Sequence, residues 1–79
     1  MSDIFDQVQR LIHRELVIDL DKITIDANLF DDLNFDSLDS VELVLAAELE
    51  FDIEISDDAF DELRTVRDIV DLVQDLVWQ

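Results

Sequence analysis

Few side chains in this sequence can carry covalent chemistry. The chain has one histidine, His13, and no cysteine, so it offers no histidine–thiol pair and no thiolate ligands for zinc. Its 22 Asp and Glu residues are so numerous that a pair of carboxylates does not by itself indicate acid–base catalysis. The acidic loops lack the glycine of an EF-hand calcium loop. The sequence therefore predicts no metal site and no catalytic residue, and places His13 on a helix surface.

A serine at a predicted helix start is the remaining reactive group. Ser37 lies between Asp36 and Leu38, where free N–H groups and partial positive charge can receive a phosphate. Asp36 and Asp39 oppose an anion there, and a serine in such a position is most often part of an N-cap. No neighbouring histidine or lysine could activate the hydroxyl, which suits an acceptor modified by another enzyme. Ser40, one turn farther along, is the weaker candidate.

Helical spacing of apolar residues predicts the elements that position this serine. The expected segments are three long helices and one short one: 3–16, capped by Ser2 or Asp3; 36 or 37 to 51; 57–63; and a last helix from Thr65, capped by Thr65 and Asp68. We therefore predict an all-α fold, a small up-down four-helix bundle, with residues 1–79 as a single domain.

The segment from 17 to 36 has irregularly spaced apolar residues separated by Asp, Asn and Thr. Such a stretch predicts a long loop between helices one and two, held to the core by its apolar side chains. A short helical turn is expected near residues 21–24. Because the chain contains no glycine and no proline, Asn, Asp and Ser must form its turns.

The second predicted helix has apolar residues on two opposite faces. At 100° per residue, one face collects Val44, Ala47 and Phe51, with Leu43 at its edge; the other collects Leu38, Val41, Leu45 and Leu49, bordered by Glu42, Glu48 and Asp52. Either the long loop covers the second face or that face is offered to another molecule. The acidic border favours an interface, because burying those charges would be costly.

Charge is distributed unevenly along the chain. The net charge is −17, and residues 23–63 contain fourteen acidic residues and no basic one. Such a field repels nucleic acid and anionic membranes and attracts proteins with basic patches, although an acidic surface kept for solubility would have the same sign. No window approaches the roughly 18 apolar residues of a membrane span, and no apolar run follows a basic N-terminal segment. We expect a cytoplasmic monomer that binds proteins, without nucleic acid or membrane insertion.

The stretch from Asp31 to Ile55, DDLNFDSLDSVELVLAAELEFDIEI, resembles the acyl carrier protein family. The family's Asp-Ser-Leu motif stands at 36–38, and the similarity extends over nearly the whole chain, including Thr65-Val66. The resemblance implies that a phosphopantetheinyl transferase moves 4'-phosphopantetheine from coenzyme A onto the Ser37 hydroxyl. The thiol of that arm then carries acyl groups as thioesters, and the chain itself is not an enzyme.

The resemblance also assigns roles to the two faces of the second helix. The partner interface would comprise Asp36, Leu38, Val41, Glu42, Leu45, Glu48 and Leu49, and the acyl cavity Leu43, Val44, Ala47, Ile55, Phe60 and Leu63. Four positions depart from the family pattern: Asn34 replaces a common glycine, Ser56 a frequent proline, Leu49 an acid and Phe60 a small residue. Asn34 can keep the left-handed turn. The bulk of Phe60 predicts a narrower acyl cavity.

Three functions stay open on these grounds. The first is an acyl carrier for fatty acid or related lipid synthesis, with acyl-transfer and chain-elongation enzymes carrying basic patches as partners. The second is a carrier of aminoacyl or polyketide units in a specialised pathway. The third is an unmodified helical adaptor that binds proteins through the same acidic face.

Overall fold

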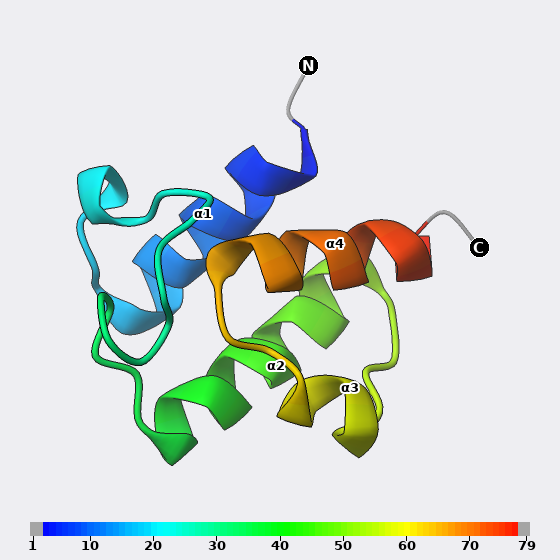
Figure 1. Cartoon of the computed structure of the whole chain (residues 1–79). Helices are drawn as coiled ribbons and strands as arrows, with labels where there is room; N and C mark the ends of the chain where they lie inside the picture. The colour runs from blue at the N-terminus through cyan, green and yellow to red at the C-terminus, as the bar shows by residue number, and fades with distance from the viewer. Residues whose placement is uncertain (1–2, 78–79) are drawn as a thin grey trace.

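The computed structural model describes residues 3–77. Its helices follow the order α1 (Ile4–Leu16), the short 3-10 turn η1 (Leu20–Lys22), α2 (Ser37–Phe51), α3 (Asp57–Asp61) and α4 (Val66–Val77) (Figure 1). Within these residues there is no strand, and one isolated bridge joins Asn28 to Thr65. The predicted all-α bundle of three long helices and one short helix is confirmed.

The caps explain where α1 and α4 begin. Asp3 is the N-cap of α1, its Oδ1 accepting from the Asp6 N–H at 2.8 Å, whereas Ser2 lies outside the described residues. Before α4, the Thr65 hydroxyl accepts from the Asp68 N–H at 3.2 Å and the Asp68 carboxylate accepts from the Thr65 N–H at 3.1 Å. This is the predicted reciprocal box, so Thr65 precedes the first helical residue rather than being it.

Two predicted bounds were wrong by a few residues. The turn expected at 21–24 lies at Leu20–Lys22, and α3 ends at Asp61 rather than at residue 63. After Asp61 the N–H groups of Glu62 and Leu63 each reach back only three residues, at 3.2 Å, which tightens the chain out of α-helical geometry.

Left-handed residues terminate elements in place of glycine. Val17 (φ 53°), Asn34 (φ 58°) and Asp52 (φ 55°) all have positive φ. Val17 and Asp52 close α1 and α2, and Asn34 turns the loop toward α2. Asparagine and aspartate tolerate this region better than most residues, so the predicted role of Asn34 in the turn is confirmed. The β-branched Val17 tolerates it poorly, so the prediction that Asn, Asp and Ser form all the turns was wrong at the end of α1.

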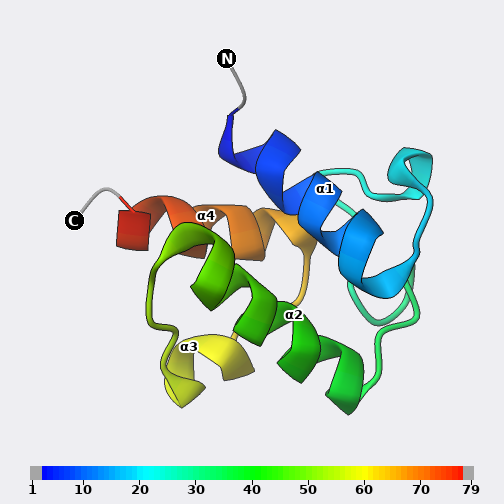
Figure 2. The same ribbon diagram turned by 180° about the vertical axis from the view of Figure 1, so that it is seen from behind.

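The core is made by α1, α2, α4 and the long loop. In both views α3 lies on the side of the molecule opposite α1, while α1 contacts α2 and α4 (Figures 1 and 2). The buried residues are Val8, Leu11, Ile12, Ile23, Ala27, Leu29, Leu33, Phe35, Leu43, Ala47, Val66, Ile69, Val70 and Val73. Five of them belong to the loop, which confirms that apolar side chains hold it to the core.

Backbone hydrogen bonds fasten the same loop to the start of α4. The Leu29 N–H donates to the Arg64 carbonyl at 2.8 Å, and the Val66 N–H donates to the Ala27 carbonyl at 3.0 Å. The Arg67 side chain adds an ion pair with Asp26 at 2.6 Å, and the hydrogen bond to this carboxylate raises the pKa of the guanidinium above its ordinary value. Long irregular segments are unusual in compact domains, and these bonds give this one fixed partners.

No helix among residues 3–77 is long and apolar enough to cross a lipid bilayer.

Candidate functional site

Ser37 is the first helical residue of α2, and its side chain is exposed. The N-cap is Asp36, whose carboxylate accepts from the Asp39 N–H at 2.9 Å, while the Asp39 carboxylate accepts from the Asp36 N–H at 3.2 Å. The cap of α2 therefore comes from two aspartates and does not use the Ser37 hydroxyl. This arrangement separates the serine from the structural role that serines most often have at helix starts.

Ser40 differs from Ser37 in both exposure and bonding. It is half-buried, and its hydroxyl donates to the Asp36 carbonyl at 3.2 Å. A hydroxyl bonded to the preceding turn is less available to a modifying enzyme than one at the exposed helix start. The structure thus favours Ser37 as the reactive hydroxyl of α2.

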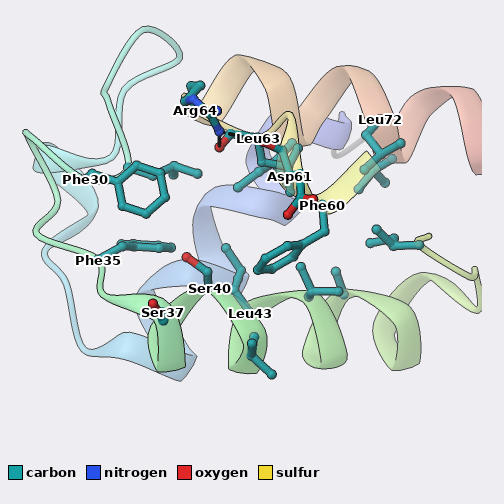
Figure 3. A pocket seen from close by; sticks show the side chains of 17 residues that line it. Phe30, Phe35, Ser37, Ser40, Leu43, Phe60, Asp61, Leu63, Arg64 and Leu72 are labelled. Atoms are coloured by element: carbon teal, nitrogen blue, oxygen red, sulfur yellow. Dashed lines mark hydrogen bonds between the residues drawn. The ribbon is translucent and has the colours of Figure 1, made fainter. Parts of the chain in front are cut away.

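A pocket of about 430 Å³ opens beside Ser37 (Figure 3). All six predicted cavity residues line it: Leu43, Val44, Ala47, Ile55, Phe60 and Leu63. They come from α2, from α3 and from the segments on either side of α3. The volume lies near the lower end of ordinary ligand pockets, about 300–1,000 Å³. The structure thus brings together residues that are up to twenty positions apart in the sequence.

Sequence reasoning missed part of this lining. The missed residues are Leu29, Phe30, Phe35, Ser40, Asp61, Arg64, Ile69, Leu72 and Val73, and Val41 was assigned to the outer face alone. Phe30 and Phe35 were visible as aromatic residues in the long loop, and α4 had an apolar stripe. Nothing in their spacing indicated that they meet across the pocket, because that depends on how the loop folds back onto α4.

The outer face of α2 is uncovered. Leu38, Val41, Leu45 and Leu49 are 72%, 45%, 55% and 85% exposed. The long loop therefore does not bury this face, which answers the question left open by periodicity. Val41 lies at the border, since it is both exposed and part of the pocket lining.

The acidic residues around this outer face differ in their contacts. Glu42 is exposed, but the Glu48 carboxylate accepts from the Ile55 N–H at 2.9 Å and is half-buried. Asp36 is held by the cap described above. Among the predicted interface acids, Glu42 thus has the most freely presented charge, while Asp36 and Glu48 also stabilise the ends of α2.

His13 lies on the surface, as predicted, and closes the end of α1. Its Nδ1 is 2.7 Å from the Ile18 carbonyl oxygen, and the Val17 N–H donates to the His13 carbonyl at 3.0 Å.

Among residues 3–77, no group of three or more His, Cys, Asp and Glu side chains is arranged to hold a metal ion.

These features fit a covalently attached prosthetic group. An exposed primary hydroxyl can form a phosphodiester, and a largely apolar pocket beside it can take an acyl chain. Phosphopantetheine, when attached, supplies the thiol that this cysteine-free chain lacks. The residues present therefore match the chemistry of a carrier.

Comparison with known proteins also indicates a phosphopantetheine carrier. Residues 6–73 match the family model "Phosphopantetheine attachment site". An acyl carrier protein from Phenylobacterium zucineum is 48% identical over 75 residues, 95% of each chain. One from Caulobacter vibrioides is 49% identical over 73 residues, 92% of this chain and 94% of the relative.

A solved structure extends this similarity to three dimensions. A Mycobacterium tuberculosis chain described as "a putative acyl carrier protein" superposes with a TM-score of 0.86 at 37% identity, covering 96% of this chain and 99% of its own length. The sequence matches and the shared fold both cover nearly all of the chain. This chain therefore belongs to the acyl carrier protein family, whose members carry covalently attached phosphopantetheine.

Proposed function

We propose that the Ser37 hydroxyl is the attachment point of 4'-phosphopantetheine, and that the chain carries acyl intermediates of fatty acid or related lipid synthesis as thioesters. The observation that carries this proposal is the position of Ser37, exposed at the first turn of α2 and lining the mouth of an apolar pocket. The cap is supplied by Asp36 and Asp39, so modification of Ser37 leaves the helix start intact.

The chain's part in loading is passive. Ser37 Oγ forms a bond to the β-phosphorus of coenzyme A, the pyrophosphate P–O bond breaks, and 3',5'-ADP leaves. In this proposal the Ser37 proton goes to a base of the transferase. The chain's one histidine, His13, lies at the other end of the preceding loop, and the nearby carboxylates of Asp36 and Asp39 are engaged by backbone N–H groups of the cap. In this proposal the carrier is a substrate of other enzymes and not a catalyst itself.

The pocket is the proposed shelter for the acyl chain. Each methylene moved from water into such a lining is worth about 0.8 kcal/mol. A chain of several carbons would thus be held firmly enough to shield its thioester and weakly enough to be released to an enzyme. Phe60 lines this pocket. That the bulk of its ring limits the space for an acyl chain stays a prediction.

The outer face of α2 is the proposed docking surface for partner enzymes. Leu38, Val41, Leu45 and Leu49 supply apolar contact, and Asp36, Glu42 and Glu48 supply negative charge. Partners with basic patches, including the phosphopantetheinyl transferase and acyl-transfer and elongation enzymes, would be steered toward the helix that bears Ser37. That the chain is a monomer, forms a single domain and lies in the cytoplasm stays a prediction.

Intact mass spectrometry tests the attachment. The apo protein is incubated with coenzyme A and a phosphopantetheinyl transferase, and the mass of one phosphopantetheine should be gained. Ser37→Ala should abolish the gain, and Ser40→Ala, the matched control one turn farther along α2, should keep it. No gain in the wild type would instead favour an unmodified adaptor, and a gain that survives Ser37→Ala would move the site elsewhere. The acyl group on the protein purified from its native cells identifies the pathway.

A further inference from the structure

One basic residue is present among the described residues that line the pocket, and it is Arg64, between α3 and α4. Figure 3 places its side chain at the rim beside Phe30, across the pocket from Ser37. The backbones confirm that these neighbours are close, because the Leu29 N–H donates to the Arg64 carbonyl at 2.8 Å. A cationic side chain therefore stands on the rim opposite the proposed attachment point.

The Arg64 side chain is fixed in this position. Its Nη1 donates to the carbonyls of Asp61 at 2.7 Å and Leu63 at 3.1 Å, and its backbone N–H donates to the Asp68 carboxylate at 2.9 Å. A guanidinium has five N–H donors in one plane, so bonds made through Nη1 leave donors on Nε and Nη2. The group is pre-organised to donate to a further oxygen atom at little cost in side-chain entropy.

Arg64 also differs from the other arginines in its charge environment. Those three each pair with a carboxylate: Arg10 with Asp6 at 3.1 Å, Arg14 with Glu50 at 3.5 Å and Arg67 with Asp26 at 2.6 Å. Within residues 3–77, Arg64 makes no such ion pair, although the chain contains 22 acidic residues. Its side chain instead donates to backbone carbonyls and lines the pocket.

We propose that Arg64 binds the polar part of the pantetheine arm, donating its remaining N–H groups to the arm's amide carbonyls when an acyl chain occupies the pocket. The inference rests on the proposed attachment at Ser37. An arm that starts at Ser37 and delivers an apolar chain into the pocket must place its amides at the mouth, where they leave water. Amide carbonyls removed from water need donors, and Arg64 supplies them on the far rim.

The phosphate of the arm is anionic and is the other group that Arg64 could bind. It is covalently tied to the side chain of Ser37, on the opposite side of the pocket. The aromatic residues Phe30 and Phe35 lie between these two positions (Figure 3). The amides farther along the arm are therefore the groups that come within reach of Arg64 when the chain enters the pocket.

Side-chain NMR of the wild-type protein tests this without any substitution. The four arginine Nε–H signals of ¹⁵N-labelled protein are compared between the holo form and a form loaded with octanoyl through a stable amide link. The Arg64 signal should shift on octanoylation, and its hydrogen exchange should slow at least about fivefold, as expected for a hydrogen bond to a charged group. The signals of Arg10, Arg14 and Arg67 should stay in place. An unchanged Arg64 signal on a carrier whose mass confirms full loading overturns the proposal.

A kinetic test uses the rate at which hydroxylamine cleaves the thioester. Arg64→Gln should speed cleavage of the octanoyl form about three- to tenfold, while Arg10→Gln, an exposed arginine on α1, should change it less than twofold. The acetyl form is the internal control, because its chain is too short to draw the arm into the pocket. Equal acceleration of acetyl and octanoyl forms would mean that the variant has only loosened the turn after α3, which contradicts the proposal. Failure of Ser37 to load at all is seen separately, by mass, and would reject the attachment instead.

Discussion

The two apolar faces of α2 differ in what covers them. On the inner face Leu43 and Ala47 are 3% and 2% exposed within the core, whereas on the outer face Leu49 is 85% exposed. Both faces use the same residue types, so hydrophobicity alone does not distinguish a core residue from a docking residue. The difference lies in the neighbours: the inner face contacts α1 and shares one buried cluster with residues of the loop and α4, whereas an acidic border surrounds the outer face.

A carrier of this size can hold its cargo and present it to enzymes because the two faces of one helix have different roles. One side of α2 forms the pocket that would hold cargo, and the other presents the surface that would meet enzymes, with Ser37 at the end shared by both. Substitutions on the inner face should therefore change stability and cargo, and those on the outer face should change encounters with partners. A substitution on one face that changed both the stability and the encounters with partners would contradict this division.

Truncation of the inner face should have the largest effect. Leu43→Ala removes buried methyl groups from the core and should lower the free energy of unfolding by about 2–4 kcal/mol. For a domain of this size that loss lowers the Tm by more than about 10 °C. Leu49→Ala, the matched change on the outer face, should stay within about 0.5 kcal/mol. Urea denaturation of the apo protein measures both, and equal losses would mean that the two faces are not distinct.

A charge on the outer face should impair docking while leaving the fold intact. Leu45→Asp should lower the kcat/KM of the phosphopantetheinyl transferase about tenfold or more, because an apolar contact near the centre of an interface is replaced by a charge that must be desolvated. The apo variant should unfold within about 0.5 kcal/mol of the wild type. Val17→Asp alters an apolar residue away from α2 that is more exposed than Leu45, 87% against 55%, and serves as the control. A transferase indifferent to Leu45→Asp would argue against docking through this face.

A smaller side chain in the pocket should change the preferred length of the acyl chain. Phe60→Leu shortens a side chain that lines the pocket and should let it hold a longer acyl chain. The rise in Tm on loading is measured for a series of acyl chain lengths. The length that gives the largest rise should increase by about one or two carbons, each worth about 0.8 kcal/mol. Phe51→Leu changes an aromatic residue of α2 that does not line the pocket, so its optimum should match the wild type. An unmoved optimum in Phe60→Leu would remove Phe60 as the limit on chain length.

The two faces of α2 were predictable because helical spacing is local. Fifteen residues, Ser37 to Phe51, carry the whole pattern in an unbroken segment, so a 100° projection separates inner from outer residues without knowledge of the rest of the fold. The capping residues Asp3, Thr65 and Asp68 were predictable for the same reason, since each acts within one turn of its own helix.

Features that depend on long-range contacts were not predictable. The rim of the pocket joins Phe30 to Arg64, and this pairing depends on the bond between residues 29 and 64. Local patterns contain no information on which turn the long loop meets. Likewise, the use of Asp36 rather than Ser37 as the cap of α2 could not be read from the sequence, because both residues are good N-caps at adjacent positions.

A change in NaCl concentration should have the smallest effect on stability, and it separates the contribution of charge from that of apolar packing. Because fourteen acidic residues of 23–63 have no basic residue among them, raising NaCl from about 10 mM to about 0.5 M should screen their repulsion and raise the Tm by a few degrees. The loss of Tm caused by Leu43→Ala should be the same at both salt concentrations, because it comes from apolar contacts alone. NaCl is preferred to sulfate, which strengthens apolar burial itself. A wild-type Tm insensitive to NaCl would show that repulsion among these acidic residues does not limit stability, and a Leu43→Ala deficit that shrinks with salt would show that charge and packing are not independent.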